Sequence, residues 1–246
     1  MVSGFTCAAM RRPRLFRPRP FLSIETVPMK FSFQQSHPVK TFFKRLILAL
    51  LAVVLILGAI WGVRLLGFQN FGVVHQGEFY RSSQMNGEQL QETIAEYGIK
   101  TVLNLRGPNP NQAWYPEELA ASQAAGAEHV DVLLSATHFP RPDEMLKLLG
   151  VLDHAPRPIL VHCVSGADRT GLAVSLYRLT QRHEPLEQAK EGLTFWFGHL
   201  WFAQAWPMGR FLEMYDQAGR PPIVPWVDGP YRMWYAQALT QGEIDE

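Results

Sequence analysis

The feature that most constrains this chain is a run of uncharged, almost entirely apolar residues, Leu46–Val63. As an α-helix, these 18 residues would be about 27 Å long, close to the thickness of the hydrocarbon core of a bilayer, and Arg64 could reach the interface. A helix in the core of a soluble domain would keep a polar face, and this run has none. The sequence therefore predicts a transmembrane anchor over residues 46–67, in contact with lipid, between a segment 1–45 and a domain 68–246.

Positive charge is concentrated before the apolar run. Residues 1–45 hold nine of the 23 basic residues and one of the 22 acidic residues, so residues 46–246 have a net charge of −7. This pattern argues against nucleic acid as a partner, because phosphate backbones are bound by a basic face on the folded domain. Lys40, Lys44 and Arg45 flank the run and predict a cytoplasmic N-terminus. We therefore expect a single-pass protein of the inner (cytoplasmic) membrane whose domain lies outside the cytoplasm, in the periplasm of a Gram-negative cell.

The segment before the anchor has an unusual composition. It is rich in arginine and proline near its start, which predicts a disordered segment over residues 1–45. Met29 begins a stretch that is more typical of the residues before an anchor, so translation could start at Met29 instead of Met1. A cleaved signal peptide is the alternative to an anchor, but no Ala-x-Ala site ends the apolar run, which favours an uncleaved helix.

The cysteine count limits the chemistry of the domain. The two cysteines, Cys7 and Cys163, fall on opposite sides of the predicted anchor. We therefore expect no disulfide framework, and Cys163 has no second thiol for a redox cycle. The sequence also contains no His-x3-His pair with acidic support and no cysteine cluster. We accordingly expect no metal and no cofactor.

The most informative motif is the segment from Ile159 to Gly171. An apolar strand pattern ends at His162-Cys163, and Arg169-Thr170-Gly171 begins a helical pattern. The backbone N–H groups between them can turn inward as an anion nest, and the helix adds the positive end of its dipole. The expected phosphate-binding residues are Val164, Ser165, Gly166, Ala167, Asp168 and Arg169. The nest and the dipole favour the thiolate form of Cys163, which is the nucleophile, and the Arg169 guanidinium can hold two phosphate oxygens at once.

This segment resembles the His-Cys-x5-Arg-Thr-Gly loop of the cysteine-dependent tyrosine and dual-specificity phosphatases. Glu78–Gln84, Tyr97–Gly107 and Phe197–Leu200 resemble segments of their bacterial atypical members. The resemblance implies hydrolysis of phosphate monoesters in which Cys163 forms a cysteinyl-phosphate that water then cleaves. The Thr170 hydroxyl could hydrogen-bond the departing sulfur.

The resemblance leaves the substrate open. It implies a phosphorylated protein, or a small or lipid-linked phosphate ester. Asp168 beside the loop disfavours a heavily phosphorylated substrate, because like charges repel. A pseudophosphatase that binds phosphorylated ligands without turnover is the competing hypothesis.

The group that protonates the leaving oxygen is less clearly marked. The family usually supplies an aspartate from a loop before the cysteine, and no residue matches that position directly. Asp143, at a predicted helix start, and His138, on the loop itself, are the two candidates. Asp131 lies within an alternating strand pattern and is less favoured. His162 either tunes the cysteine loop or is simply a buried histidine.

Strand and helix patterns alternate from residue 69 onward. The expected strands are 79–81, 101–105, 130–134 and 159–162, and the expected helices are 86–97, 116–125, 142–153, 170–180, 185–197, 207–218 and 230–240. For the first of these helices, Asn86 is the expected cap and Gly98 the expected stop. This alternation predicts an α/β domain of the cysteine-phosphatase type, with a mostly parallel central sheet and helices on both faces. Cys163 would lie at the carboxyl end of a strand, where such folds bind ligands. The aromatic residues of 195–206 are expected to pack in the core, and the alternative is that they line a pocket or touch the bilayer.

Overall fold

The computed structural model describes residues 38–67, 69–200 and 205–245. Helix α1 runs from Pro38 to Gly67, and its segment Lys40–Arg64 is long and apolar enough to cross a membrane. The helix includes the predicted anchor over 46–67. It begins earlier than the anchor, so residues 38–45 are helical where disorder was expected, since residues 39–45 contain no proline or glycine to end the helix. The remaining residues of the N-terminal segment, 1–37, lie outside the described residues.

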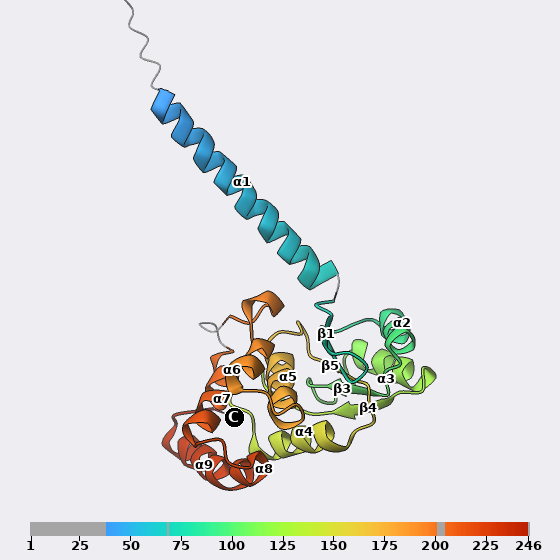
Figure 1. Ribbon diagram of the computed structural model, residues 1–246. Coiled ribbons are helices and arrows are strands. Elements are labelled where there is room, and N and C mark those ends of the chain that lie inside the picture. Colours follow the sequence, from blue (N-terminus) through green and yellow to red (C-terminus); the bar gives the residue numbers. More distant parts are fainter. Residues whose placement is uncertain (1–37, 68, 201–204, 246) are drawn as a thin grey trace, which may run out of the picture. The chain divides into compact units, whose positions relative to one another are not determined.

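The chain after α1 is built on a five-stranded sheet with the strand order β1-β2-β5-β3-β4 (Figure 1). The strands are β1 (Gly72–His75), β2 (Phe79–Ser82), β3 (Thr101–Asn104), β4 (Glu128–Asp131) and β5 (Ile159–His162). Strand β1 pairs with β2 in antiparallel orientation, and all other neighbours are parallel. Strand β5 is therefore central, between β2 and β3. The mostly parallel α/β sheet predicted from the alternating pattern is confirmed.

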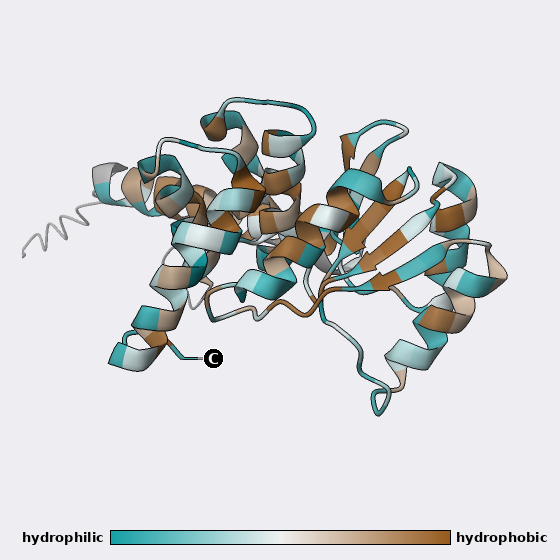
Figure 2. Cartoon of the chain, turned by 90° about the horizontal axis from the view of Figure 1, so that it is seen from below, coloured by the Kyte–Doolittle hydropathy of each residue, from teal (hydrophilic) through white to brown (hydrophobic). Residues whose placement is uncertain are grey.

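Helices cover both faces of this sheet. On one face, Ile159 and Val161 of β5 pack in a cluster with α4 (Pro142–His154) and α5 (Asp168–Thr180). On the other face, Leu160 packs with α2 (Gly87–Tyr97) and α3 (Trp114–Ala124). Because successive side chains of a strand point to opposite faces, both sets are buried, and the strand is apolar from Ile159 to Val161. Figure 2 shows this as hydrophobic colour along the central strands between the helices.

Helix α2 shows how local sequence sets an element's ends. The Asn86 side chain accepts a hydrogen bond from Gln89 N at 2.9 Å, and the Gln89 side chain accepts one from Asn86 N at 3.2 Å. This capping box satisfies two backbone donors at the start of the helix. Gly98 ends the helix with φ 64°, a left-handed conformation that glycine adopts without steric cost. The predicted cap at Asn86 and stop at Gly98 are both confirmed.

The chain after α5 is mostly helical and packs beside α4 and α5. Its elements are α6 (Leu186–Ala189), η1 (Lys190–Gly192), η2 (Phe195–Phe197), α7 (Trp206–Gln217), α8 (Ile223–Trp226), the π-helical turn η3 (Val227–Tyr231) and α9 (Arg232–Gln241). Phe211 and Tyr231 meet edge to face, with ring centroids 4.9 Å apart. These aromatic contacts join α7 to the turn before α9.

Three expectations about local structure are wrong. The predicted helix over 185–197 is broken, because Gly192 lies so close to α5 that an added Cβ would be 2.6 Å from Gly171 O. The strand predicted at 130–134 lies at Glu128–Asp131 instead, where it matches β3 residue by residue from Thr101 to Asn104. Among the aromatic residues expected in the core, Phe195 and Trp196 are 62% and 55% exposed, and Trp201 and Phe202 lie outside the described residues.

Candidate active site

The cysteine loop, residues 163–169, joins the carboxyl end of β5 to α5. Three parallel strands end in register here, since Ser82 of β2 and Asn104 of β3 both pair with His162 of β5. Cys163 is the first residue after the central strand and is 2% exposed. Arg169 lies in the first turn of α5. The fold therefore places the thiol and the guanidinium at the two ends of one short loop, as the sequence predicted.

The carbonyl groups of this loop are bonded on its outer side. Gln84 N donates to Val164 O at 3.0 Å, and the Asn70 side chain donates to Ser165 O at 2.9 Å. Arg81 donates through Nη2 to Gly166 O at 2.7 Å. A peptide's N–H points away from its C=O, so these bonds turn the following N–H groups to the inside of the loop. This is the arrangement that the expected anion nest requires.

Gly166 is required by both conformation and space. Its φ is 70°, and a Cβ built there would lie 2.6 Å from Ser82 O and 2.8 Å from Ser83 N. These are backbone atoms and cannot swing aside. The loop can therefore lie against the end of β2 only with glycine at this position.

Arg81 is a buried cation behind the loop and belongs to the segment Glu78–Gln84 that resembles the family. It is 1% exposed and also donates to Gly192 O at 2.8 Å, while its guanidinium carbon lies 3.6 Å from the ring centre of Phe197. Burial lowers the pKa of Arg81 to about 9, although the nearby Cys163 acts in the opposite direction. An arginine in a strand is more often a solvated charge, so its place in the sequence is only a weak indication of this role.

The Arg169 guanidinium has one hydrogen-bond acceptor among the described residues. Its Nη1 donates to Leu134 O at 3.3 Å, and its buried Nε has no hydrogen-bond partner among the described residues. A fork with unused donors beside an anion nest is suited to a phosphate group. The Thr170 hydroxyl is buried and has no partner within the described part of the chain, including the Cys163 sulfur.

His162 belongs to a buried polar network under the loop. Its Nε2 lies 3.2 Å from Glu118 Oε1, and Nε2 of His129 lies 2.7 Å from the same oxygen. The Gln84 side chain donates to the second oxygen of Glu118 and accepts from Arg106 Nη1 at 2.8 Å. Sequence reasoning missed Glu118, because nothing in the pattern of a helix shows which acid faces a distant histidine.

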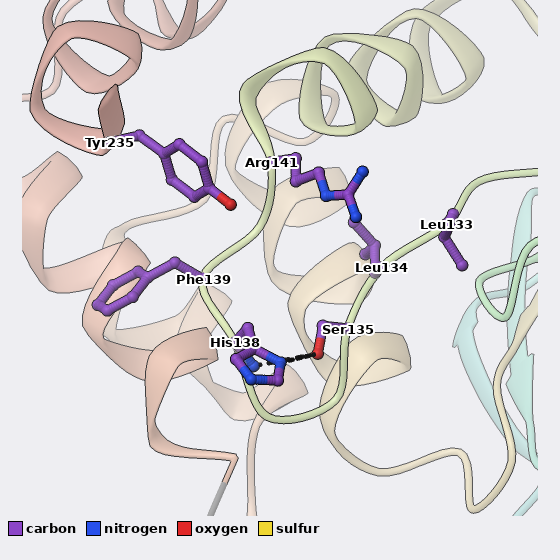
Figure 3. A pocket seen from close by; sticks show the side chains of 7 residues that line it. All are labelled: Leu133, Leu134, Ser135, His138, Phe139, Arg141 and Tyr235. Atoms are coloured by element: carbon purple, nitrogen blue, oxygen red, sulfur yellow. Dashed lines mark hydrogen bonds between the residues drawn. The ribbon is translucent and has the colours of Figure 1, made fainter. Parts of the chain in front are cut away.

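The candidates for proton donor lie in different surroundings. Asp143 is 83% exposed and pairs with Arg232 at 2.7 Å on the surface. Asp131 is the last residue of β4, and its carboxylate accepts hydrogen bonds from the side chains of Asn104 and Tyr115. His138 lies on the loop before α4, 2.8 Å from the Ser135 hydroxyl (Figure 3).

His138 also lines a cavity of about 160 Å³. The lining residues are Leu133, Leu134, Ser135, His138, Phe139, Arg141 and Tyr235 (Figure 3). Leu134 lines this cavity, and its carbonyl accepts the hydrogen bond from Arg169 of the cysteine loop. Of the candidates in the sequence, His138 lines this cavity, whereas Asp143 is paired with Arg232 at the surface.

Comparison with known proteins agrees with this geometry. Residues 68–197 match the family described as "PTP-NADK: DSP-PTPase phosphatase fused to NAD+ Kinase". The dual specificity protein phosphatase TpbA of Pseudomonas aeruginosa is 31% identical over 121 residues, which cover 46% of this chain. The match spans 50% of TpbA, so the chain spans about half the length of this curated relative.

Solved structures share the fold. The crystal structure of P. aeruginosa TpbA has a TM-score of 0.51 and 22% identity, covering 64% of this chain and 92% of that one. TpbA in complex with pTyr has a TM-score of 0.50 and 21% identity, covering 63% and 90%. The family match extends over more than half of the chain and includes the loop with Cys163 and Arg169. The chain therefore belongs to the DSP-PTPase family of phosphatases.

Proposed function

We propose that this protein hydrolyses phosphate monoesters through a cysteinyl-phosphate on Cys163. The observation that supports the proposal most directly is the cysteine loop itself. Its carbonyls at Val164, Ser165 and Gly166 accept hydrogen bonds from Gln84, Asn70 and Arg81, which supports a nest in which the N–H groups that follow them face the phosphate between Cys163 and Arg169. Such a cup binds three phosphate oxygens and leaves phosphorus in line with the sulfur.

The reaction has two steps. The Cys163 thiolate attacks phosphorus, and the P–O bond to the leaving group breaks while Arg169 holds two of the remaining oxygens. Water then attacks the cysteinyl-phosphate, and inorganic phosphate leaves as the thiolate is restored. The loop N–H groups and Arg169 stabilise the charge that develops on the equatorial oxygens in both steps.

A phosphotyrosine-containing protein is the substrate class that we propose first. The support is the family, together with TpbA, which is named a dual specificity phosphatase and has been crystallised with pTyr. A small or lipid-linked phosphate ester is the second class. The exposed apolar helix α1 is compatible with a lipid-linked substrate, because the helix would keep the enzyme at a membrane.

The test uses the full-length protein in detergent micelles. We expect hydrolysis of an aryl phosphate and, after acid quench of a reaction with labelled substrate, one covalent phosphate per chain. Cys163→Ser should abolish both signals, and Cys7→Ser, which changes the other cysteine, should retain both. Vanadate binding without turnover by the parent protein would instead support the pseudophosphatase. Turnover by Cys163→Ser would exclude the cysteinyl-phosphate mechanism.

We further propose that α1 is a single inner-membrane anchor with its N-terminus in the cytoplasm and the domain of residues 68–246 in the periplasm. Lys40, Lys44 and Arg45 before the apolar run support this orientation. A reporter enzyme that is active only outside the cytoplasm, fused after residue 246, should be active. A reporter that is fluorescent only in the cytoplasm should be dark at the same position, and the opposite pair of results would reverse the topology.

A further inference from the structure

The proposed reaction requires a proton for the leaving oxygen, and the structure contains a carboxyl group within the cysteine loop itself. Asp168 directly precedes Arg169 and is the first residue of α5. Its side chain is 24% exposed, so it is neither sealed in the core nor fully in solvent. Asp131 and Asp143, by contrast, are already bonded to groups outside the loop.

Asp168 is held by a buried histidine. Nδ1 of His199 lies 2.7 Å from Asp168 Oδ1, and the His199 side chain is 6% exposed. This is the only hydrogen bond to the Asp168 side chain that the described residues provide, so Oδ2 remains available. An acid in the first turn of a helix is favoured by the helix dipole alone. The dipole, however, does not explain why a buried imidazole is aimed at one oxygen of this acid.

The segment with His199 is fixed to the cysteine loop. His199 N donates to Thr194 O at 3.1 Å, which closes a tight turn after η2. The Asn70 side chain donates to both Phe197 O and Ser165 O, each at 2.9 Å. One amide thus ties the turn and the loop together, so the position of the imidazole relative to Asp168 is set by bonds on both sides. The Phe197-Gly198-His199 segment therefore serves to hold the His199 imidazole beside Asp168.

Taking the proposed phosphatase function as the basis, we propose that Asp168 is the catalytic acid and base, and that His199 is the residue that positions it. As Cys163 attacks phosphorus and the P–O bond breaks, the leaving oxygen takes the proton from the Asp168 carboxyl. The resulting carboxylate accepts the Nδ1–H of His199. In the second step the carboxylate takes a proton from the attacking water while the S–P bond breaks, which restores the thiolate and the protonated acid.

The arrangement also explains why Asp168 does not simply pair with its neighbour. The Arg169 guanidinium donates a hydrogen bond to Leu134 O, while the Asp168 carboxyl group is hydrogen-bonded to His199. The two adjacent side chains are therefore directed to different partners. The guanidinium is left for the phosphate oxygens, and the carboxyl group is left for the leaving oxygen.

Dependence on the leaving group is the decisive measurement. Full-length protein in detergent is assayed with aryl phosphates whose phenols range from strongly acidic, such as dinitrophenol, to weakly acidic, such as phenol. Asp168→Asn should lower kcat/KM, which reports the first chemical step alone, about 100-fold or more for phenyl phosphate. It should change kcat/KM little for dinitrophenyl phosphate, because that leaving group needs no proton in the first step. Asp168→Glu should recover part of the phenyl phosphate rate, and His199→Asn should show a weaker form of the same dependence.

His138→Asn is the competing variant, because His138 lies on the neighbouring loop. An equal loss by Asp168→Asn across all phenols, with no recovery in Asp168→Glu, overturns the proposal, as does the leaving-group dependence appearing in His138→Asn instead. Failure of the proposed function gives a separate result. In that case Cys163→Ser would match the parent protein on every ester, whatever the behaviour of Asp168→Asn.

Discussion

Glu118 Oε1 and His162 Nε2 lie 3.2 Å apart under the cysteine loop, although the two residues are 44 positions apart in the chain. Both side chains are buried, at 2% and 3% exposure. His162 precedes Cys163 directly, and its Nδ1 lies 3.4 Å from Cys163 O. The carboxylate therefore fixes the imidazole that adjoins the nucleophile.

We expect the stability of the protein to fall in acid because of Glu118. Burial acts to raise its pKa, but hydrogen bonds from His129, His162 and Gln84 outweigh burial and hold the pKa well below the ordinary range. A depressed pKa gives stability that is complete above the unfolded value of 4.5 and is lost as the pH falls through the folded value. Urea unfolding should therefore show a decreasing free energy of unfolding between about pH 5 and pH 3.

Glu118→Gln should remove that pH dependence and cost about 3 kcal/mol at neutral pH, because both histidines lose a charged acceptor. The control is Glu117→Gln, which changes an exposed neighbour on the same helix that accepts from Gly87 N at 2.8 Å. It should cost no more than about 1 kcal/mol. Equal effects of the two variants would contradict the role given to the buried network.

Gly166→Ala should abolish turnover. The new Cβ would be strained at φ 70° and would meet the backbone of Ser82 and Ser83 at less than 3 Å, so the loop would have to move away from β2. The matched change is Gly150→Ala in α4, where nothing lies within 4 Å of the added Cβ. It should stabilise the protein by about 0.5–1 kcal/mol. Vanadate affinity and thermal unfolding of the two variants check both expectations, and a Gly166→Ala protein that turns over normally would contradict the first.

Arg81→Lys should impair the enzyme even though the charge is kept. A lysine ammonium is a point charge that cannot donate to Gly166 O and Gly192 O from separate nitrogens while stacking on Phe197. Losing one bond to a charged donor costs about 1.5–3 kcal/mol. Unfolding and kcat/KM of Arg81→Lys are compared with those of Arg210→Lys, a surface residue paired with Glu213. Indistinguishable values would show that the buried guanidinium is not needed.

Tyr177→Phe should lower the stability of the protein without changing its activity. The Tyr177 ring stacks on Phe79 with centroids 4.2 Å apart, and its hydroxyl donates to Glu78 at 2.8 Å. Burial, followed by this hydrogen bond, raises the pKa of Tyr177, so the hydroxyl stays protonated as a donor. Glu78 precedes β2, at the end of the strands opposite Cys163. We expect a loss of about 1 kcal/mol in unfolding free energy and an unchanged kcat, and a large fall in kcat would contradict this separation.

Local rules explain which parts of the fold the sequence predicted. The Asn86 cap, the Gly98 stop and the apolar run into Cys163 depend on residues close together in the chain. Other residues of the site act through distant contacts, with partners 31 to 111 positions away in the chain, namely Arg81, Glu118 and His199. A periodic pattern of apolar residues does not indicate which distant residues will meet. The broken helix at Gly192 has the same origin, because its close approach to Gly171 is a tertiary contact.

Because β2, β5 and β3 end in a common register, the packed sheet lies on one side of the strand ends and the segments proposed to set substrate specificity lie on the other. Ser82, His162 and Asn104 end their strands at the same level of the sheet, and the proposed phosphate site lies in the short segments beyond that level. A library that varies only those segments would leave the packed layers untouched. New ester preferences should therefore be selectable without rebuilding the domain.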